Sequence, residues 1–280
     1  MTTVLAALDT SAAARPVLET ACRLAELTGS EVEAVHVHTD PAEHDDTPEG
    51  LAERAGVPLT RLPGPVEEAL LGALEAPGVV AMAIGAHGLP DGRRLVGHTA
   101  ATVLERAGKP LVVVPAEAVS PSAFTRLLAP LEGTERSTRP VVEQLLPLLG
   151  TDLDLLVLHV YDEATLPPML DHPEYDLRIL GGEFLARHFP TSTRIELRTG
   201  SVAERVTEVA DEQGVDLIVM SWSQDPSPER ARTVREVLRT TRLPVLLVPA
   251  GPSGSYGPTC RPGTPAGTGT EAATAATAGG

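Results

Sequence analysis

The sequence predicts an α/β protein with two tandem domains, each a five-stranded parallel sheet that carries helices on both faces. Two observations support this fold class. Short apolar runs alternate with segments of helical periodicity, and the whole pattern occurs twice in the same order. Strands that alternate with helices require right-handed crossovers, which place successive strands parallel in one sheet.

The repeat is visible in landmarks that recur at nearly constant spacing. His36-Val37 returns 123 residues later as His159-Val160, and the run from Val79 to Gly85 returns 136 residues later. The run that follows Pro110 returns 134 residues later, after Pro244. The changes in spacing indicate 13 residues gained after the second strand of the second copy and two lost after the fourth. A repeat of this length is a whole domain rather than a solenoid unit.

The strands expected in the first copy are short and almost continuously apolar, as required of strands covered on both faces. They run over residues 4–8, 32–37, 59–62, 79–84 and 111–114.

Helical patterns fill the intervals between these strands. Ser11 is a candidate N-cap for the first helix, and Gly29 is the residue expected to end it. A weaker helix is expected around residues 51–55. Pro65 is expected to open the third helix, and residues 99–107 to form the fourth.

The second copy repeats this order from Leu127 to Val248. Its insertion lies between Tyr161 and Gly200 and contains an apolar helical pattern. The expected domains are residues 1–116 and 124–250, with a linker over 117–123 and a disordered Gly/Pro/Thr/Ala tail over 251–280. The fifth strands, 111–114 and 245–248, are apolar and expected at sheet edges. We expect them to pair within one chain, which predicts a compact monomer in which the two halves form a pseudo-dimer.

Composition excludes several classes of function. The net charge of -16 repels phosphate backbones and anionic membranes, so we expect neither nucleic-acid nor membrane binding. The N-terminus does not resemble a signal peptide, and Cys22 and Cys260 form no disulfide framework, which favours a cytoplasmic protein. No P-loop, Gly-x-Ser-x-Gly elbow or nucleophile with an identifiable base is present, so no enzyme activity is expected.

Two loops of the first half have the chemistry of a ligand site. In an open parallel sheet, ligands bind beyond the carboxyl ends of strands, where the strand order reverses. Asp9-Thr10-Ser11 follows the first strand, and Gly85-Ala86-His87-Gly88 follows the fourth. Gly97-His98-Thr99 then opens a helix whose amides favour an anion, and Arg93 and Arg94 add charge. On spacing alone, these glycines are equally well explained as turn residues and the arginines as a solvated loop.

Taken together and in order, these landmarks resemble the universal stress protein family over nearly all of residues 3–250. The family pattern has an Asp after the first strand, a His-Val pair ending the second, Gly-x-x-Gly after the fourth, and a Pro-led fifth strand. In the second half, Asp216-Leu217-Ile218-Val219-Met220 matches the fourth strand closely. The resemblance implies Rossmann-like domains of the HUP type, in which the fifth strands join the two halves.

The resemblance also implies a ligand, ATP with Mg²⁺, held in the first half. The expected binding residues are Asp9, Thr10, Val37, Gly85, His87, Gly88, Gly97, His98 and Thr99. The chain departs from the family in two respects: its glycine loop is one residue shorter, and His98 stands where a hydroxyl residue belongs. Either Thr99 substitutes for that residue, or His98 donates to a phosphate.

The second half has lost this motif. Ser221 and Gln224 replace two glycines, Ala231-Arg232 replaces the Gly-Ser pair, and Glu132 replaces the Asp. We expect Trp222 to fill the vacant pocket.

The function expected is a non-catalytic, stress-related regulatory protein with weak adenine-nucleotide binding in the first half. The alternative is a nucleotide-independent scaffold that acts through protein contacts, and a hydrolase using Asp9, His87 and bound metal ranks lowest. His36 and His38 share a strand face beside an acidic stretch, but a solvated loop explains that stretch better than a metal site.

Overall fold

The structure is a computed structural model that describes residues 1–11, 13–38, 46–86, 97–115, 117–118, 121–148, 152–161, 173–189, 193–225, 227 and 231–250. The tail expected over 251–280 lies outside the described residues, as do parts of the linker region and of the insertion. The expected domain boundaries therefore stay predictions.

The first half forms five parallel strands in the order β3-β2-β1-β4-β5. Its strands are β1 (Thr3–Ala7), β2 (Glu31–His38), β3 (Leu59–Pro63), β4 (Val79–Gly85) and β5 (Leu111–Val114). Its helices are α1 (Ala14–Thr28), α2 (Asp46–Ala55), α3 (Val66–Glu75) and α4 (His98–Arg106). All five expected strands are present, with ends that differ by one residue or so.

The second half repeats the topology as β10-β9-β6-β7-β8, again with parallel neighbours. Its strands are β6 (Arg126–Pro130), β7 (Asp154–Tyr161), β8 (Arg194–Thr199), β9 (Leu217–Trp222) and β10 (Val245–Pro249). Its α-helices are α5 (Glu135–Leu145), α6 (Pro173–His188), α7 (Val202–Gln213) and α8 (Arg232–Thr240), with a 3₁₀ turn over Leu146–Leu148.

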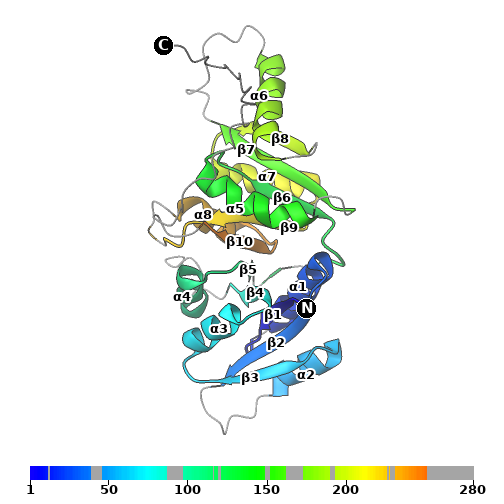
Figure 1. Cartoon of the computed structure of the whole chain (residues 1–280), viewed down its shortest axis with the longest axis vertical. Coiled ribbons are helices and arrows are strands. Elements are labelled where there is room, and N and C mark those ends of the chain that lie inside the picture. Colours follow the sequence, from blue (N-terminus) through cyan, green and yellow to red (C-terminus); the bar gives the residue numbers. More distant parts are fainter. Residues whose placement is uncertain are drawn as a thin grey trace, which may run out of the picture.

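The halves meet through β5 and β10, which pair antiparallel with Val112 opposite Leu246. The result is one ten-stranded sheet that runs the length of the molecule (Figure 1). All four residues of β5 are buried. This confirms the expected pairing of the fifth strands, which covers the backbone groups that a free sheet edge would expose.

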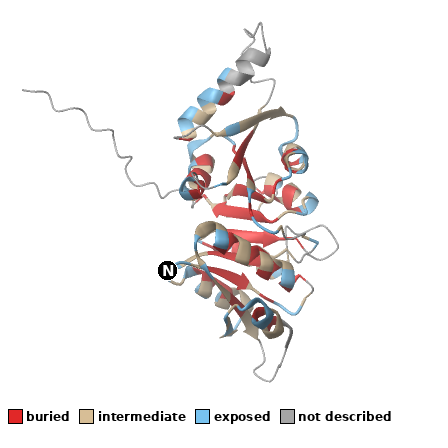
Figure 2. Ribbon diagram, turned by 90° about the vertical axis from the view of Figure 1, so that its right-hand side faces the viewer, coloured by how far each residue is buried: buried red, intermediate tan, exposed pale blue. Residues whose placement is uncertain are grey.

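Strand alternation divides the core into two layers. Leu5 faces one layer, while its neighbours Val4 and Ala6 face the other. Helices α3, α4, α7 and α8 contribute to the first layer, and α1 and α5 to the second. Each layer contains residues from both halves, so the buried core is continuous across the junction (Figure 2).

The expected role of Ser11 as the N-cap of the first helix is wrong. Helix α1 begins at Ala14 with Ala13 as its N-cap, and no side chain in the described part of the chain caps it. The Ser11 hydroxyl instead donates to Asp9 Oδ1 at 2.7 Å and accepts a hydrogen bond from the Ala13 amide at 3.2 Å. Ser11 therefore serves the loop after β1 rather than the helix.

Helix α6 is the helix expected within the insertion, and it packs against β8. Gly181 permits this close approach, because a Cβ atom there would lie 3.1 Å from the Ile195 Cγ2 atom and 3.4 Å from the Leu197 Cδ1 atom. The insertion thus covers one face of an edge strand of the second half.

Candidate ligand-binding site

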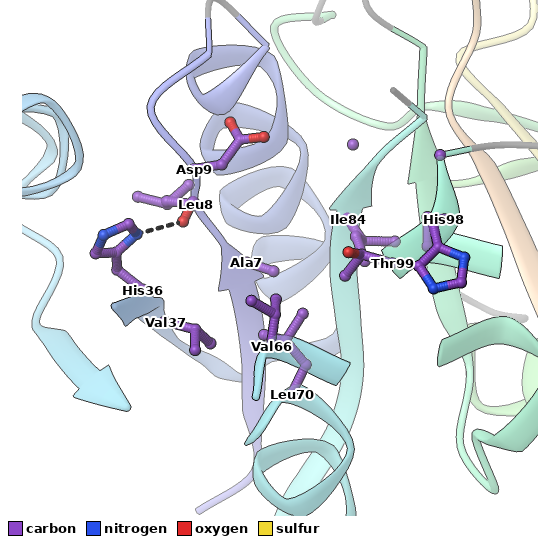
Figure 3. Close-up of a pocket in the computed structure, with 13 residues that line it drawn as sticks. Ala7, Leu8, Asp9, His36, Val37, Val66, Leu70, Ile84, His98 and Thr99 are labelled. Carbon is purple, nitrogen blue, oxygen red and sulfur yellow. Dashed lines mark hydrogen bonds between the residues drawn. The ribbon is translucent and has the colours of Figure 1, made fainter. Parts of the chain in front are cut away.

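A cavity of about 350 Å³ opens at the carboxyl ends of β1 and β4 (Figure 3). The chain passes from β1 through β2 to β3 on one side of β1, and then returns to place β4 on the other side. The crevice between β1 and β4 is therefore the point at which the strand order reverses, where open α/β sheets bind ligands.

Asp9 stands at the mouth of this cavity, just beyond β1. Its Oδ1 atom accepts hydrogen bonds from the Ser11 amide at 3.0 Å and from the Ser11 hydroxyl at 2.7 Å. These bonds to the following turn orient the carboxylate, while the residue as a whole stays exposed to solvent. The cavity thus has an oriented negative charge at its rim.

The end of β2 forms a second wall. His36 Nδ1 lies 2.9 Å from the carbonyl oxygen of Leu8, a bond drawn in Figure 3. This bond fixes the imidazole against the end of β1, and the next residue, Val37, also lines the cavity. The second half contains the same arrangement, with His159 Nδ1 2.9 Å from the carbonyl oxygen of Leu131.

The start of α4 forms the opposite wall. Gly97 is its N-cap in an extended conformation (φ -52°, ψ 159°), and within the described residues no side chain caps the helix. The first amides of an α-helix have no intrahelical partner, and together with the helix dipole they favour an anion. His98, Thr99 and Ala100 of this first turn all line the cavity.

The hydroxyl of Thr99 is already engaged. It donates a hydrogen bond to Glu67 Oε1 of α3 at 3.2 Å. A hydroxyl has one proton to donate, so Thr99 cannot donate to a bound anion while this bond persists. Glu67 also places a second negative charge beside the start of α4.

The floor of the cavity is apolar. Val66 and Leu70 of α3 face Ala7 and Ile84, the residues near the ends of β1 and β4. Leu70 and Ile84 are both buried. The helical spacing of α3 places positions 66 and 70 on the same face of the helix, which is turned toward the sheet. The cavity therefore combines an apolar slot with a polar rim.

Six of the nine residues expected from the sequence line this cavity, namely Asp9, Val37, Gly85, Gly97, His98 and Thr99. Thr10 is exposed and does not line it. His87 and Gly88 lie outside the described residues, as do Arg93 and Arg94. Val66 and Leu70 also line the cavity and were not among the expected site residues, although their inward helical spacing is the signal that places them over this end of the sheet.

The second half has a cavity of about 540 Å³ at the equivalent point, beyond β6 and β9. The changes in the glycine motif have therefore not removed the hollow itself. Its walls carry Glu132, Ser221 and Thr233 where the first cavity has Asp9, Gly85 and Thr99.

The expectation that Trp222 fills this cavity is wrong. Trp222 is the last residue of β9, 2% exposed, and forms part of the cavity wall. Its indole Nε1 donates a hydrogen bond across the junction to the carbonyl oxygen of Leu104 in α4, at 2.8 Å. Gln224 Nε2 donates similarly to the carbonyl oxygen of Ala107, at 2.6 Å. The indole is directed to the first half because it satisfies a helix-end carbonyl there.

Within the described residues, no group of three or more His, Cys, Asp or Glu side chains has an arrangement that could hold a metal ion. None of the helices in the described part of the chain combines the length and apolar character needed to cross a membrane.

The fold and the positions of the two cavities define a class of protein. It has two Rossmann-like α/β domains in tandem, each with a cavity at the point where its strand order reverses. Residues 123–249 match the model of the Universal stress protein family. The match to the universal stress protein family therefore lies in the second half of the chain, and the first half repeats the same fold.

Solved structures resemble the chain over both halves. A universal stress protein from Archaeoglobus fulgidus DSM 4304 is 19% identical, with a TM-score of 0.63, and the match covers 89% of this chain and 98% of that one. A functionally unknown protein from Pseudomonas aeruginosa PAO1 is 14% identical, with a TM-score of 0.66, over 88% of this chain and 92% of that one. At these identities the likeness shows the fold alone. None of the curated proteins matches the chain.

Proposed function

We propose that the first half binds an adenine nucleotide weakly and that the protein acts as a cytoplasmic, non-catalytic regulator in stress responses. The observation that supports this most is the convergence of three features at one switch point. An apolar slot, an oriented carboxylate and an uncapped helix start surround a cavity of about 350 Å³. Ligand pockets in proteins commonly measure about 300–1,000 Å³ and combine apolar walls with a few polar groups.

Each part of the cavity suits one part of a nucleotide. The slot formed by Val37, Val66 and Ile84 suits the planar base. The Asp9 carboxylate accepts hydrogen bonds, as ribose hydroxyls require, and it is a ligand type that Mg²⁺ accepts. The amides at the start of α4 suit a phosphate.

The same residues account for weak rather than tight binding. Glu67 holds the Thr99 hydroxyl and adds negative charge where a phosphate would lie. The net charge of -16 opposes the approach of a polyanion. His98, which is exposed at the first position of α4, is then the side chain best placed to donate to a phosphate.

The test is a calorimetric titration of the full-length protein with ATP and Mg²⁺. We expect a stoichiometry near one. Val37→Phe, which fills the first cavity, should abolish binding, and the equivalent Val160→Phe in the second half should preserve it. Saturation at about 100 times the dissociation constant should also stabilise the folded protein by about 2.7 kcal/mol.

Other results would favour a different function. No heat at several temperatures, with the protein folded, would support the nucleotide-independent scaffold. Binding that survives Val37→Phe would place the nucleotide elsewhere. Turnover of ATP that Asp9→Asn abolishes would contradict the non-catalytic role.

A further inference from the structure

The cavity of the second half preserves the apolar part of the first cavity. Leu131, Val160, Val202 and Met220 line it, at the positions that Leu8, Val37, Val66 and Ile84 occupy in the first half. Both cavities therefore have an aliphatic slot bounded by the first, second and fourth strands of their half and by the helix before the fourth strand.

The end of β9 and the start of the loop that follows are bonded to the first half. Gln224 adopts a positive φ of 60° and, together with Trp222, donates to carbonyl oxygens at the end of α4. These two hydrogen bonds hold Trp222 and Gln224 against the first half, so the start of this loop is not free to wrap around a phosphate chain. Ser221 also brings a side chain to the position at which the first half has Gly85.

Among the described residues, the charged groups of the second cavity balance. Glu132 and Arg136 line it, so this part of its wall carries one negative and one positive side chain. The remaining polar lining consists of hydroxyls, among them Ser221, Ser223 and Thr233. Hydroxyls both donate and accept hydrogen bonds, which matches ring nitrogens and ligand hydroxyls rather than a polyanion.

We propose that this second cavity is a separate ligand site for a neutral, phosphate-free ring compound that bears hydroxyl groups, the class to which nucleosides belong. The apolar slot receives the ring, and the hydroxyl rim with Glu132 pairs with the hydroxyl groups. The volume of about 540 Å³ is ample for such a molecule. Within the described part of the chain, both α4 and α8 begin at an N-cap residue that makes no side-chain cap hydrogen bond. The two halves then differ in selectivity because the first has Gly85 and Gly97 where the second has Ser221 and Ala231, and because Gln224 bonds to the first half.

The chain carries its own probe for this site. Trp222 is the only tryptophan and forms part of the cavity wall. Adenosine is the test compound, with ATP as the comparison, and its binding is measured both by Trp222 fluorescence and by calorimetry. The matched variants are Val160→Phe, which fills the second cavity, and Val37→Phe, which fills the first. Circular dichroism and thermal unfolding establish that each variant is folded.

We expect adenosine to change the Trp222 fluorescence saturably in the wild type and in Val37→Phe. Its affinity should fall at least about tenfold in Val160→Phe, which is about 1.4 kcal/mol. In Val37→Phe, ATP should bind at least about tenfold more weakly than adenosine. This design separates the second site from nucleotide binding in the first half, since Val37→Phe removes only the latter.

Three results would overturn the proposal. Adenosine that gives neither heat nor a fluorescence change would exclude a site for this class. An affinity lost in Val37→Phe and retained in Val160→Phe would assign the compound to the first cavity. Equal affinities for ATP and adenosine in Val37→Phe would contradict the selectivity against phosphates.

Discussion

The indole nitrogen of Trp222 lies 2.8 Å from the carbonyl oxygen of Leu104, 118 residues earlier in the chain. Leu104 is in the last turn of α4, where carbonyl oxygens have no partner within the helix. The last strand residue before the β9 loop thus completes the hydrogen bonding of a helix in the other half. The same helix begins at the first cavity, so its two ends face a ligand site and the domain junction.

Trp222→Phe should lower the free energy of unfolding by about 1–3 kcal/mol, because it leaves the buried Leu104 carbonyl without its donor. Denaturant-induced unfolding measures this loss. Arg232→Gln, an exposed change on α8, is the control and should stay within about 0.5 kcal/mol of the wild type. A Trp222→Phe protein as stable as this control would show that the bond contributes little.

Glu67→Gln should strengthen ATP binding by about two- to fivefold, because it removes a negative charge beside the start of α4. Calorimetric titration measures the change in affinity. Glu68→Gln is the matched control, since it alters the same charge one residue away, where the partner is Arg106 at 3.9 Å. Equal effects of the two variants would assign the gain to net charge rather than to the Thr99 contact.

Gly133→Ala should destabilise the fold by about 1–3 kcal/mol. Its φ is +89°, which alanine rarely adopts, and a Cβ atom would lie 2.9 Å from Phe184 Cε2. Gly182→Ala is the control, because no described atom beyond the backbone of α6 and the adjacent residues lies within 4 Å of its Cβ position, and it should stabilise by about 0.5–1 kcal/mol. Thermal unfolding of both variants tests the difference in sign.

Acid should destabilise the protein in part through His188. Burial, with Arg187 as the next cause, lowers the pKa of His188, while Glu135 opposes the shift and His159 adds to it. Because the unfolded chain then binds this proton more readily than the folded one, stability falls as pH drops below about 6.5. The loss should continue until the pH reaches the lowered pKa.

His188→Gln should therefore reduce the loss of thermal stability between pH 7.5 and pH 5.5. The side chain lies against Phe184, with ring centroids 4.9 Å apart, and Phe184 in turn lies 4.7 Å from His159. The wild type and the variant are compared by the slopes of their melting temperatures against pH. Identical slopes would contradict a contribution from His188.

The architecture could be predicted from the sequence because the patterns that indicate it are either local in the chain or repeated in both halves. The equal spacing of His36 and His159 from the first strand of each half predicted corresponding positions, and both imidazoles bond to equivalent carbonyls 28 residues away. The apolar run at 111–114 predicted an edge in need of a partner, and β10 provides it.

The side-chain contacts that determine the chemistry of the candidate site could not be predicted from the sequence. The bond between Thr99 and Glu67 joins helices whose relative rotation no local pattern specifies. The direction of Trp222 depends on a helix end in the other half, so its expected place inside the cavity was wrong. The turn at Ser11 was misassigned because a serine before a helix serves equally well as a cap or as a donor to a nearby carboxylate.

The antiparallel pairing of β5 with β10 joins two halves of the same chain, which determines how their association depends on protein concentration. Two separate subunits that join through such strands part on dilution, because association depends on their concentration. In one chain, the connecting segment sets a high effective concentration that dilution cannot lower. The junction, and with it the support that Trp222 gives to α4, is thereby independent of how much protein is present.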